Sequence, residues 1–187
     1  MAEGIRPGHK EFIISETKDI ADGVREFTFE KGLAVEPGQY VMAWIPGASE
    51  NPLSVRSGYP FRLAVKKRGD WSGAFHMKQK GDSIFIRGPY GRGFTHPIDK
   101  DDVPSSTPVI GIAGGYGSVP VLSALEYLEA NGFGVLRAML GAKTRSGLLY
   151  LEEFWEKLQE ESVLAATEDG SEGRRGMVTG LFENWHE

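Results

Sequence analysis

Short apolar runs separated by turn residues fill the first half of the chain. The runs are rich in β-branched and aromatic residues and several alternate in polarity, which is typical of strands with one buried face. Turn-forming pairs such as Asp22-Gly23 and Pro37-Gly38 separate them. The pattern predicts one short helix over residues 72–78 and six strands, over residues 12–16, 24–29, 39–44, 52–56, 62–67 and 83–87. Six such strands favour a closed antiparallel β-barrel, because closure removes exposed strand edges.

The pattern changes in the second half. Three continuous apolar runs, at 108–113, 135–141 and 162–166, are typical of strands buried on both faces. Between them, residues 119–130 and 149–159 have the 3.6-residue apolar spacing of amphipathic helices. Strands and helices that alternate in this way predict an α/β domain with a parallel sheet and right-handed crossovers.

A polar segment with a proline, residues 99–107, lies between the two patterns. Segments of this kind commonly connect domains, and a chain of 187 residues is long enough for two small domains that each bury a core. We therefore predict a β-barrel domain over residues 1–100 and an α/β domain over residues 107–187.

The chain contains no cysteine. This excludes disulfides, thiolate nucleophiles and cysteine-ligated iron–sulfur clusters within this sequence, so redox chemistry has to come from a bound cofactor. The histidines, at positions 9, 76, 96 and 186, have no spacing that puts two on one helical face. We therefore expect no metal site.

The net charge of −5 is unevenly distributed. Residues 61–100 hold nine Lys/Arg against three Asp/Glu, whereas residues 151–187 hold three against ten. The basic stretch either attracts a phosphate-bearing cofactor or an acidic protein, or is a solvated barrel surface. No apolar run approaches the roughly 18 residues of a membrane span, and the N-terminal residues lack the apolar core of a secretory signal. We expect a cytoplasmic protein with neither a membrane nor a nucleic-acid partner.

A glycine-rich turn joins the strand predicted at 108–113 to the helix predicted at 119–130. Glycines at 114, 115 and 117 let the backbone approach a pyrophosphate closely, and the helix N-terminus offers free N–H groups to the anion. Phosphate binding is one interpretation. The other is that glycine only allows the turn, as it does in many α/β proteins.

Small hydroxyl residues and an arginine alternate with apolar residues along 51–57. Strand alternation would place Pro52, Ser54 and Arg56 on one face and Leu53 on the other. A hydroxyl that projects from a rigid strand can hydrogen-bond a ring nitrogen of a planar cofactor. An edge strand with one polar face has the same pattern, so this segment alone does not decide between the two.

Several segments, in their order and spacing, resemble the ferredoxin reductase superfamily. They are residues 51–57, Gly-Asp-Trp-Ser at 69–72, Gly-Pro-Tyr-Gly-Arg-Gly-Phe at 88–94 and the glycine-rich turn. The sequences at 140–145, 149–154 and 167–171 make the chain more similar to the electron-transfer subunit of dihydroorotate dehydrogenase. The resemblance covers nearly the whole chain. It implies a six-stranded antiparallel flavin-binding barrel followed by a truncated NAD(P)-binding-like domain.

The resemblance also implies roles for individual residues. Ser54 matches the family's serine near the reactive flavin nitrogen and is the expected catalytic residue. Asn51 and Pro52 lie in the segment that lines the flavin, and Leu53 would pack against the isoalloxazine ring. Gly69 and Ser72 match the family's turn that holds the flavin diphosphate. The glycines that match the nicotinamide dinucleotide turn are Gly114, Gly115 and Gly117. The residues that match the dinucleotide cleft are Thr144, Arg145, Asp169 and Gly170.

The implied activity is hydride transfer from NADH or NADPH to a flavin, followed by electron transfer to a redox partner protein. FAD is the expected flavin and FMN the alternative. A dihydroorotate dehydrogenase catalytic subunit of pyrimidine biosynthesis is the candidate partner, and homo-oligomerisation stays open. The alternative function is a flavin- or nucleotide-binding module without turnover, with a regulatory or docking role.

The sequence departs from the family at three points. Asn51 stands where the family usually has arginine, which replaces a charge-assisted contact to the diphosphate by a neutral one. Lys66, Lys67 or Arg68 would then have to compensate. The family's cysteine-rich segment, and the strand and helix expected after Phe182, do not occur in this sequence. We therefore expect no iron–sulfur cluster and an incomplete nicotinamide pocket.

Overall fold

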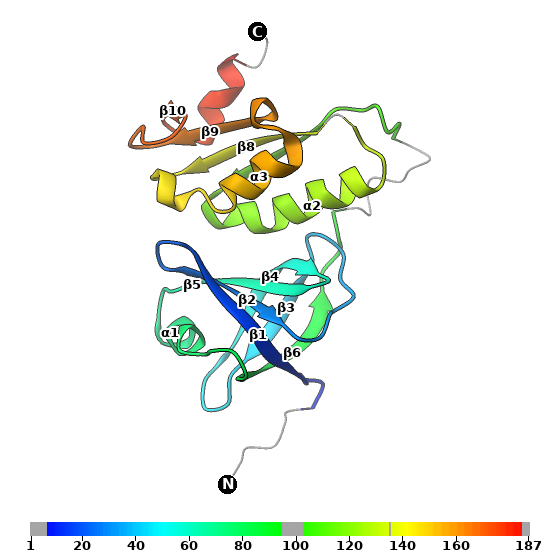
Figure 1. Cartoon of the computed structure of the whole chain (residues 1–187), viewed down its shortest axis with the longest axis vertical. Helices are drawn as coiled ribbons and strands as arrows, with labels where there is room; N and C mark the ends of the chain where they lie inside the picture. The colour runs from blue at the N-terminus through cyan, green and yellow to red at the C-terminus, as the bar shows by residue number, and fades with distance from the viewer. Residues whose placement is uncertain (1–6, 95–102, 135, 185–187) are drawn as a thin grey trace. The chain divides into compact units, whose positions relative to one another are not determined.

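The computed structural model describes residues 7–94, 103–134 and 136–184. The chain forms two compact units, Met1–Phe94 and Thr95–Glu187 (Figure 1). The segment 99–107, predicted as the connection, lies partly outside the described residues.

The first unit is a closed barrel of six antiparallel strands in the order β1-β2-β5-β4-β3-β6. This confirms the predicted barrel. Its strands are β1 Lys10–Ala21, β2 Val24–Phe29, β3 Tyr40–Trp44, β4 Glu50–Gly58, β5 Phe61–Lys66 and β6 Ser83–Tyr90. β1 is longer than predicted, because its polar second half pairs with β2 in a hairpin that turns at Gly23, where φ is +66°. That half was not predicted as a strand, because its residues do not alternate between apolar and polar.

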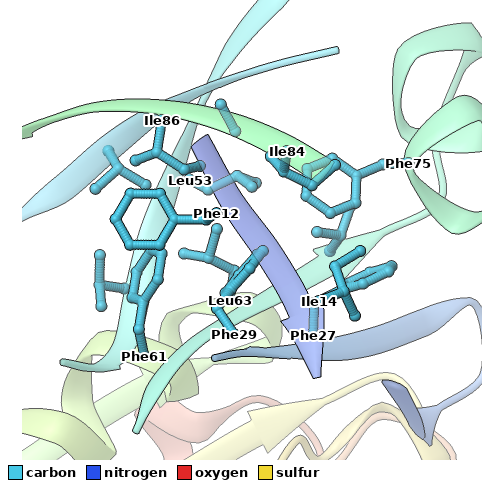
Figure 2. Packing of buried hydrophobic residues seen from close by; sticks show 14 of the residues in the cluster. Phe12, Ile14, Phe27, Phe29, Leu53, Phe61, Leu63, Phe75, Ile84 and Ile86 are labelled. Atoms are coloured by element: carbon cyan, nitrogen blue, oxygen red, sulfur yellow. The ribbon is translucent and has the colours of Figure 1, made fainter. Parts of the chain in front are cut away.

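Aromatic side chains fill the barrel (Figure 2). The Phe61 ring stacks on Phe29 with a centroid distance of 4.9 Å and meets Phe12 edge-on at 5.1 Å. Helix α1 (Asp70–His76) adds Phe75, which is fully buried and lies edge-on to Phe27 at 4.7 Å. A short helix is therefore part of the barrel core, although it begins two residues before the predicted one.

The second unit contains a four-stranded parallel sheet in the order β10-β9-β8-β7. Its elements are β7 Val109–Gly114, α2 Ser118–Ala130, β8 Leu136–Ala142, α3 Leu151–Leu158, β9 Val163–Thr167 and β10 Arg174–Arg175. The predicted parallel α/β arrangement is confirmed. The short β10 and the 3-10 segment η4 (Val178–Asn184) were not predicted.

Helices α2 and α3 lie on one face of this sheet and η4 on the other (Figure 1). On the helix face, a Cβ at Gly111 would lie 2.6 Å from Val121 Cγ1 and 2.9 Å from Leu125 Cδ1. On the other face, a Cβ at Gly141 would lie 2.7 Å from Val178 Cβ. Glycine on two strands therefore lets both layers approach the sheet closely.

Candidate functional site

Ser54 lies on the outer face of the barrel. Along β4, Leu53 and Val55 point into the core, whereas Pro52 is exposed and Ser54 is half-buried. Ser54 is directly opposite Tyr40 of β3, so their side chains share the outer face. Its hydroxyl has no hydrogen-bond partner among residues 7–94, 103–134 and 136–184. A rigid strand thus presents a hydroxyl beside an aromatic ring.

Leu53 lies on the opposite face of β4 from Ser54. Its side chain is only 8% exposed and belongs to the barrel core (Figure 2). The side chain that the sequence analysis expects against a flavin ring therefore packs against other core side chains. Asn51 has the same parity along the strand as Leu53, and its amide Nδ2 donates to Ser49 Oγ at 3.0 Å.

The predicted alternation of β4 ends after Val55. The pairing of β4 with β5 shifts register between Val55 and Ser57, as at a β-bulge. Val55 and Arg56 are consequently both buried, although the alternation predicts Arg56 on the same face as the exposed Pro52. Sequence periodicity cannot show such a bulge, because one extra residue changes the face of those that follow.

Two tyrosines that the sequence pattern does not single out lie beside Ser54. Tyr40 pairs with Ser54 on one side and with Tyr90 of β6 on the other. The two tyrosine rings are 5.8 Å apart at an interplanar angle of 38°. Tyr40 remains 38% exposed, so its ring is accessible on the outer face. The alternation along residues 40–44 was the available signal, but only the strand register places both rings next to Ser54.

The turn after β5 contains Gly69 and Ser72. The Ser72 hydroxyl accepts hydrogen bonds from the backbone N–H groups of Arg68 (2.8 Å) and Gly69 (3.0 Å), and donates one to the Gly69 carbonyl (3.0 Å). Ser72 is 7% exposed. Its hydroxyl therefore orders the turn, and a phosphate there would meet backbone groups and the exposed side chains of residues 66–68.

In the second unit, the glycine-rich turn follows β7 directly. Gly114 ends the strand, Gly115 has a φ of +50°, and the 3-10 turn η1 (Gly115–Gly117) leads into α2. A Cβ at Gly114 or Gly115 would meet no atom within 4 Å, and one at Gly117 only Ala113 Cβ at 3.9 Å. The N-terminus of α2 has no side-chain cap. The positions where side chains of Gly114 and Gly115 would stand are therefore open.

Thr144 and Arg145 follow β8 at the same edge of the sheet. Arg145 Nε donates to Glu172 Oε2 at 2.9 Å, and Nη2 donates to Glu152 Oε1 at 3.3 Å. Thr144 Oγ1 lies 2.9 Å from Ser146 Oγ. The positive charge of Arg145 is therefore matched by two carboxylates, so a phosphate ligand would have to compete with both. The 27-residue separation from Glu172 hides this pair from sequence reasoning.

Asp169 and Gly170 lie in the turn after β9. Asp169 Oδ1 accepts hydrogen bonds from the Ser171 hydroxyl (2.6 Å) and backbone N–H (3.0 Å), and these bonds lower the pKa of the Asp169 carboxyl. Gly170 has a φ of +77°. The backbone N–H of Asp169 donates to the Lys143 carbonyl at 3.2 Å, which joins the turns after β8 and β9. The residues after β8 and β9 that are predicted to contact the dinucleotide therefore lie together at the carboxyl edge of the parallel sheet. Open α/β sheets bind their ligands at this edge.

No group of three or more histidine, cysteine or acidic residues is placed to hold a metal ion in the described parts of the chain. His96 and His186 lie outside those parts. None of the helices within the described ranges is both long and apolar enough to span a membrane.

No protein-family model matches the chain. Solved structures share its fold. The NADH-dependent reduced ferredoxin-NADP oxidoreductase has a TM-score of 0.79 at 24% identity, covering 97% of this chain and 65% of that one. A ferredoxin NADP+ reductase from Neisseria gonorrhoeae, solved with bound FAD and NADP, has a TM-score of 0.76 at 19% identity, covering 96% and 77%. The chain thus has the fold of the ferredoxin reductase superfamily.

Proteins named as one kind of subunit are more similar to it in sequence. The chain is 34% identical over 166 residues to the probable dihydroorotate dehydrogenase B (NAD(+)) electron transfer subunit of Methanocaldococcus jannaschii. That match covers 89% of this chain and 59% of the relative, so the chain spans about three fifths of the relative's length.

Proposed function

We propose that this chain is an electron-transfer component of a flavin-dependent oxidoreductase. Its barrel would hold FAD, its α/β unit would bind NADH, and electrons would pass to a partner protein. The observation that carries the proposal is the Ser54 hydroxyl, which has no partner within the described chain and lies beside the Tyr40 ring on the outer barrel face. A hydroxyl and an aromatic face together suit a planar heteroaromatic ring.

Each residue on this face has a proposed task. Ser54 hydrogen-bonds a ring nitrogen, and Tyr40 and Pro52 contact the ring through their apolar surfaces. The Gly69 turn and the exposed cations of residues 66–68 are the groups proposed to bind the diphosphate, whereas Asn51, on the other face of β4 from Ser54, could join them only by leaving Ser49. When bound, a flavin supplies the chemistry of taking up two electrons as hydride and releasing them one at a time. FMN has a single phosphate and would therefore engage fewer of these diphosphate-binding groups.

The carboxyl edge of the parallel sheet is the proposed dinucleotide site. Backbone N–H groups at Gly114, Gly115 and Gly117 would contact the pyrophosphate, because these glycines carry no side chain and nothing lies within 4 Å of where a Cβ of Gly114 or Gly115 would stand. Thr144, Asp169 and Gly170 are proposed to contact the adenosine half. We propose NADH rather than NADPH, because Glu152 and Glu172 already pair with Arg145 and would repel a 2′-phosphate.

The proposed partner is a catalytic subunit of the dihydroorotate dehydrogenase kind. The similarity to the Methanocaldococcus jannaschii protein, a probable electron transfer subunit of dihydroorotate dehydrogenase B, supports this choice. The chain would exchange electrons with that subunit.

Adding FAD and then NADH to the purified full chain tests the proposal. We expect a yellow protein whose absorbance bleaches anaerobically with NADH, and more slowly with NADPH at equal concentration. A yellow protein that neither nucleotide bleaches would contradict turnover and support a binding module. A protein that remains colourless in excess FAD would overturn the flavin assignment.

Replacing Ser54 with alanine should slow flavin reduction by NADH about 2- to 12-fold, the effect of losing one hydrogen bond of about 0.5–1.5 kcal/mol. Stopped-flow absorbance measures the rate. Ser83→Ala is the matched control, because the Ser83 hydroxyl bonds Glu11 on the exposed barrel surface at 2.5 Å. If the flavin in both variants is reduced at the wild-type rate, the role assigned to Ser54 is wrong.

A further inference from the structure

A line of polar contacts runs along the outer barrel face from His9 to Tyr90. His9 Nε2 lies 2.9 Å from Glu50 Oε1, and the histidine side chain is only 4% exposed. Glu50 also accepts two hydrogen bonds from Arg87, from Nε to Oε1 at 2.6 Å and from Nη2 to Oε2 at 3.0 Å. His9 Nδ1 is buried without a hydrogen-bond partner in the described chain, so the geometry favours a proton on Nε2.

Arg87 connects this cluster to the tyrosines. Its Nη1 donates to the Tyr90 hydroxyl at 3.2 Å, and its guanidinium carbon lies 5.5 Å from the centroid of the Tyr90 ring. The Tyr90 ring lies 5.8 Å from Tyr40, which is the cross-strand neighbour of Ser54. A continuous set of contacts therefore leads from a buried histidine to the ring beside Ser54.

The Glu50–Arg87 pair differs from a single-contact surface ion pair in its geometry. The Arg87 guanidinium lowers the pKa of the Glu50 carboxyl, although desolvation opposes this. Glu50 is 16% exposed on its side chain, and both carboxylate oxygens are engaged. Bidentate, charge-assisted bonds in such surroundings fix the angle of the guanidinium as well as its distance. The Arg87 side chain is itself 38% exposed, so the pair holds a guanidinium in place at the barrel surface.

We propose that Glu50 and Arg87 are positioning residues, which hold Tyr90 against Tyr40 so that the two rings form a rigid wall beside the Ser54 hydroxyl. The inference rests on the proposed function, because the wall serves the flavin ring. A wall ordered before binding spares the ligand the entropy cost of ordering it. Arg87 acts through Tyr90 and not by contact with the ligand.

The test is FAD titration of the full chain carrying Glu50→Gln, followed by flavin fluorescence. The variant keeps the shape of the side chain but removes the charge that holds Arg87. We expect FAD binding to weaken about 2- to 12-fold, the cost of ordering one side chain at a binding site. We also expect bound flavin to fluoresce more strongly, because a mobile tyrosine quenches it less.

Asp19→Asn is the matched control. Asp19 forms a second bidentate pair on the same barrel, with Arg25 Nε at 2.7 Å and Nη2 at 3.1 Å, but on the β1–β2 hairpin. The Asp19→Asn variant should bind FAD with wild-type affinity, and its bound flavin should have wild-type fluorescence. If Glu50→Gln fails to fold, Tyr90→Phe carries the test, since it removes only the oxygen that Arg87 binds.

Three results separate the possible failures. Wild-type affinity and fluorescence in Glu50→Gln, or in Tyr90→Phe, would overturn the positioning role while leaving the flavin site intact. Equal weakening in Glu50→Gln and Asp19→Asn would show a general loss of barrel stability and also overturn it. A wild-type chain that binds no FAD would overturn both the positioning role and the proposed function.

Discussion

Alanine at Gly173 is expected to destabilise the α/β unit by about 2–5 kcal/mol. Two effects add. Gly173 has a φ of +61°, which side chains rarely adopt, and a Cβ there would lie 2.0 Å from the Ala165 carbonyl oxygen. That oxygen belongs to β9 and cannot move without disturbing the sheet. The turn that carries Asp169 and Gly170 would be displaced with it, so nucleotide binding should weaken as well.

Hydrogen exchange followed by mass spectrometry measures this effect unit by unit. Peptides from β8 and β9 should lose protection in Gly173→Ala, whereas barrel peptides should keep it. Gly132→Ala is the control, because Gly132 also has a positive φ of +89° but no atom within 4 Å of an added Cβ. It should cost about 1–2 kcal/mol, the price of the backbone conformation alone. Equal protection in the two variants would contradict the predicted clash.

Truncating Phe61 to alanine is expected to destabilise the barrel by about 3–5 kcal/mol. Phe61 is fully buried and packs against both Phe29 and Phe12, so its removal opens a cavity that the closed barrel cannot easily collapse. A loss of this size is a large share of a domain's typical stability of about 5–15 kcal/mol. The barrel should therefore unfold at a lower urea concentration and, if the proposed flavin is bound, release it on unfolding.

Urea unfolding with barrel-specific hydrogen exchange checks the prediction. Phe94→Ala offers a matched control, since Phe94 is 46% exposed and its removal leaves a smaller defect. Its effect should be well under half that of Phe61→Ala. If the two variants unfold at the same urea concentration, the aromatic packing of Phe61 contributes less to barrel stability than its contacts indicate.

The strands could be predicted from the sequence where one face is buried. The predicted and observed bounds of β2 agree at residues 24–29, because β-branched and aromatic residues fill the run and the Asp22-Gly23 turn precedes it. β10 has only two residues, both exposed, and leaves no periodic signal. The second half of β1 is polar and becomes a strand only through its pairing with β2.

The candidate site was predictable in part. The outward position of Ser54 follows from alternation along β4. Tyr40, Tyr90 and Arg87 join it only through the register of β3 with β4 and β6, which tertiary closure determines. Likewise, the sequence suggests Arg145 as a phosphate contact, but its ion pairs depend on how the turns after β8 and β9 fold.

Barrel closure has a consequence for molecular recognition. In the first unit every one of the six described strands has two hydrogen-bonded neighbours, because β6 returns to pair with β1. Another polypeptide cannot extend this sheet by adding a strand to it. Whatever protein docks on the barrel must be selected by side-chain shape and charge, so single surface substitutions should be able to change that choice without altering the fold.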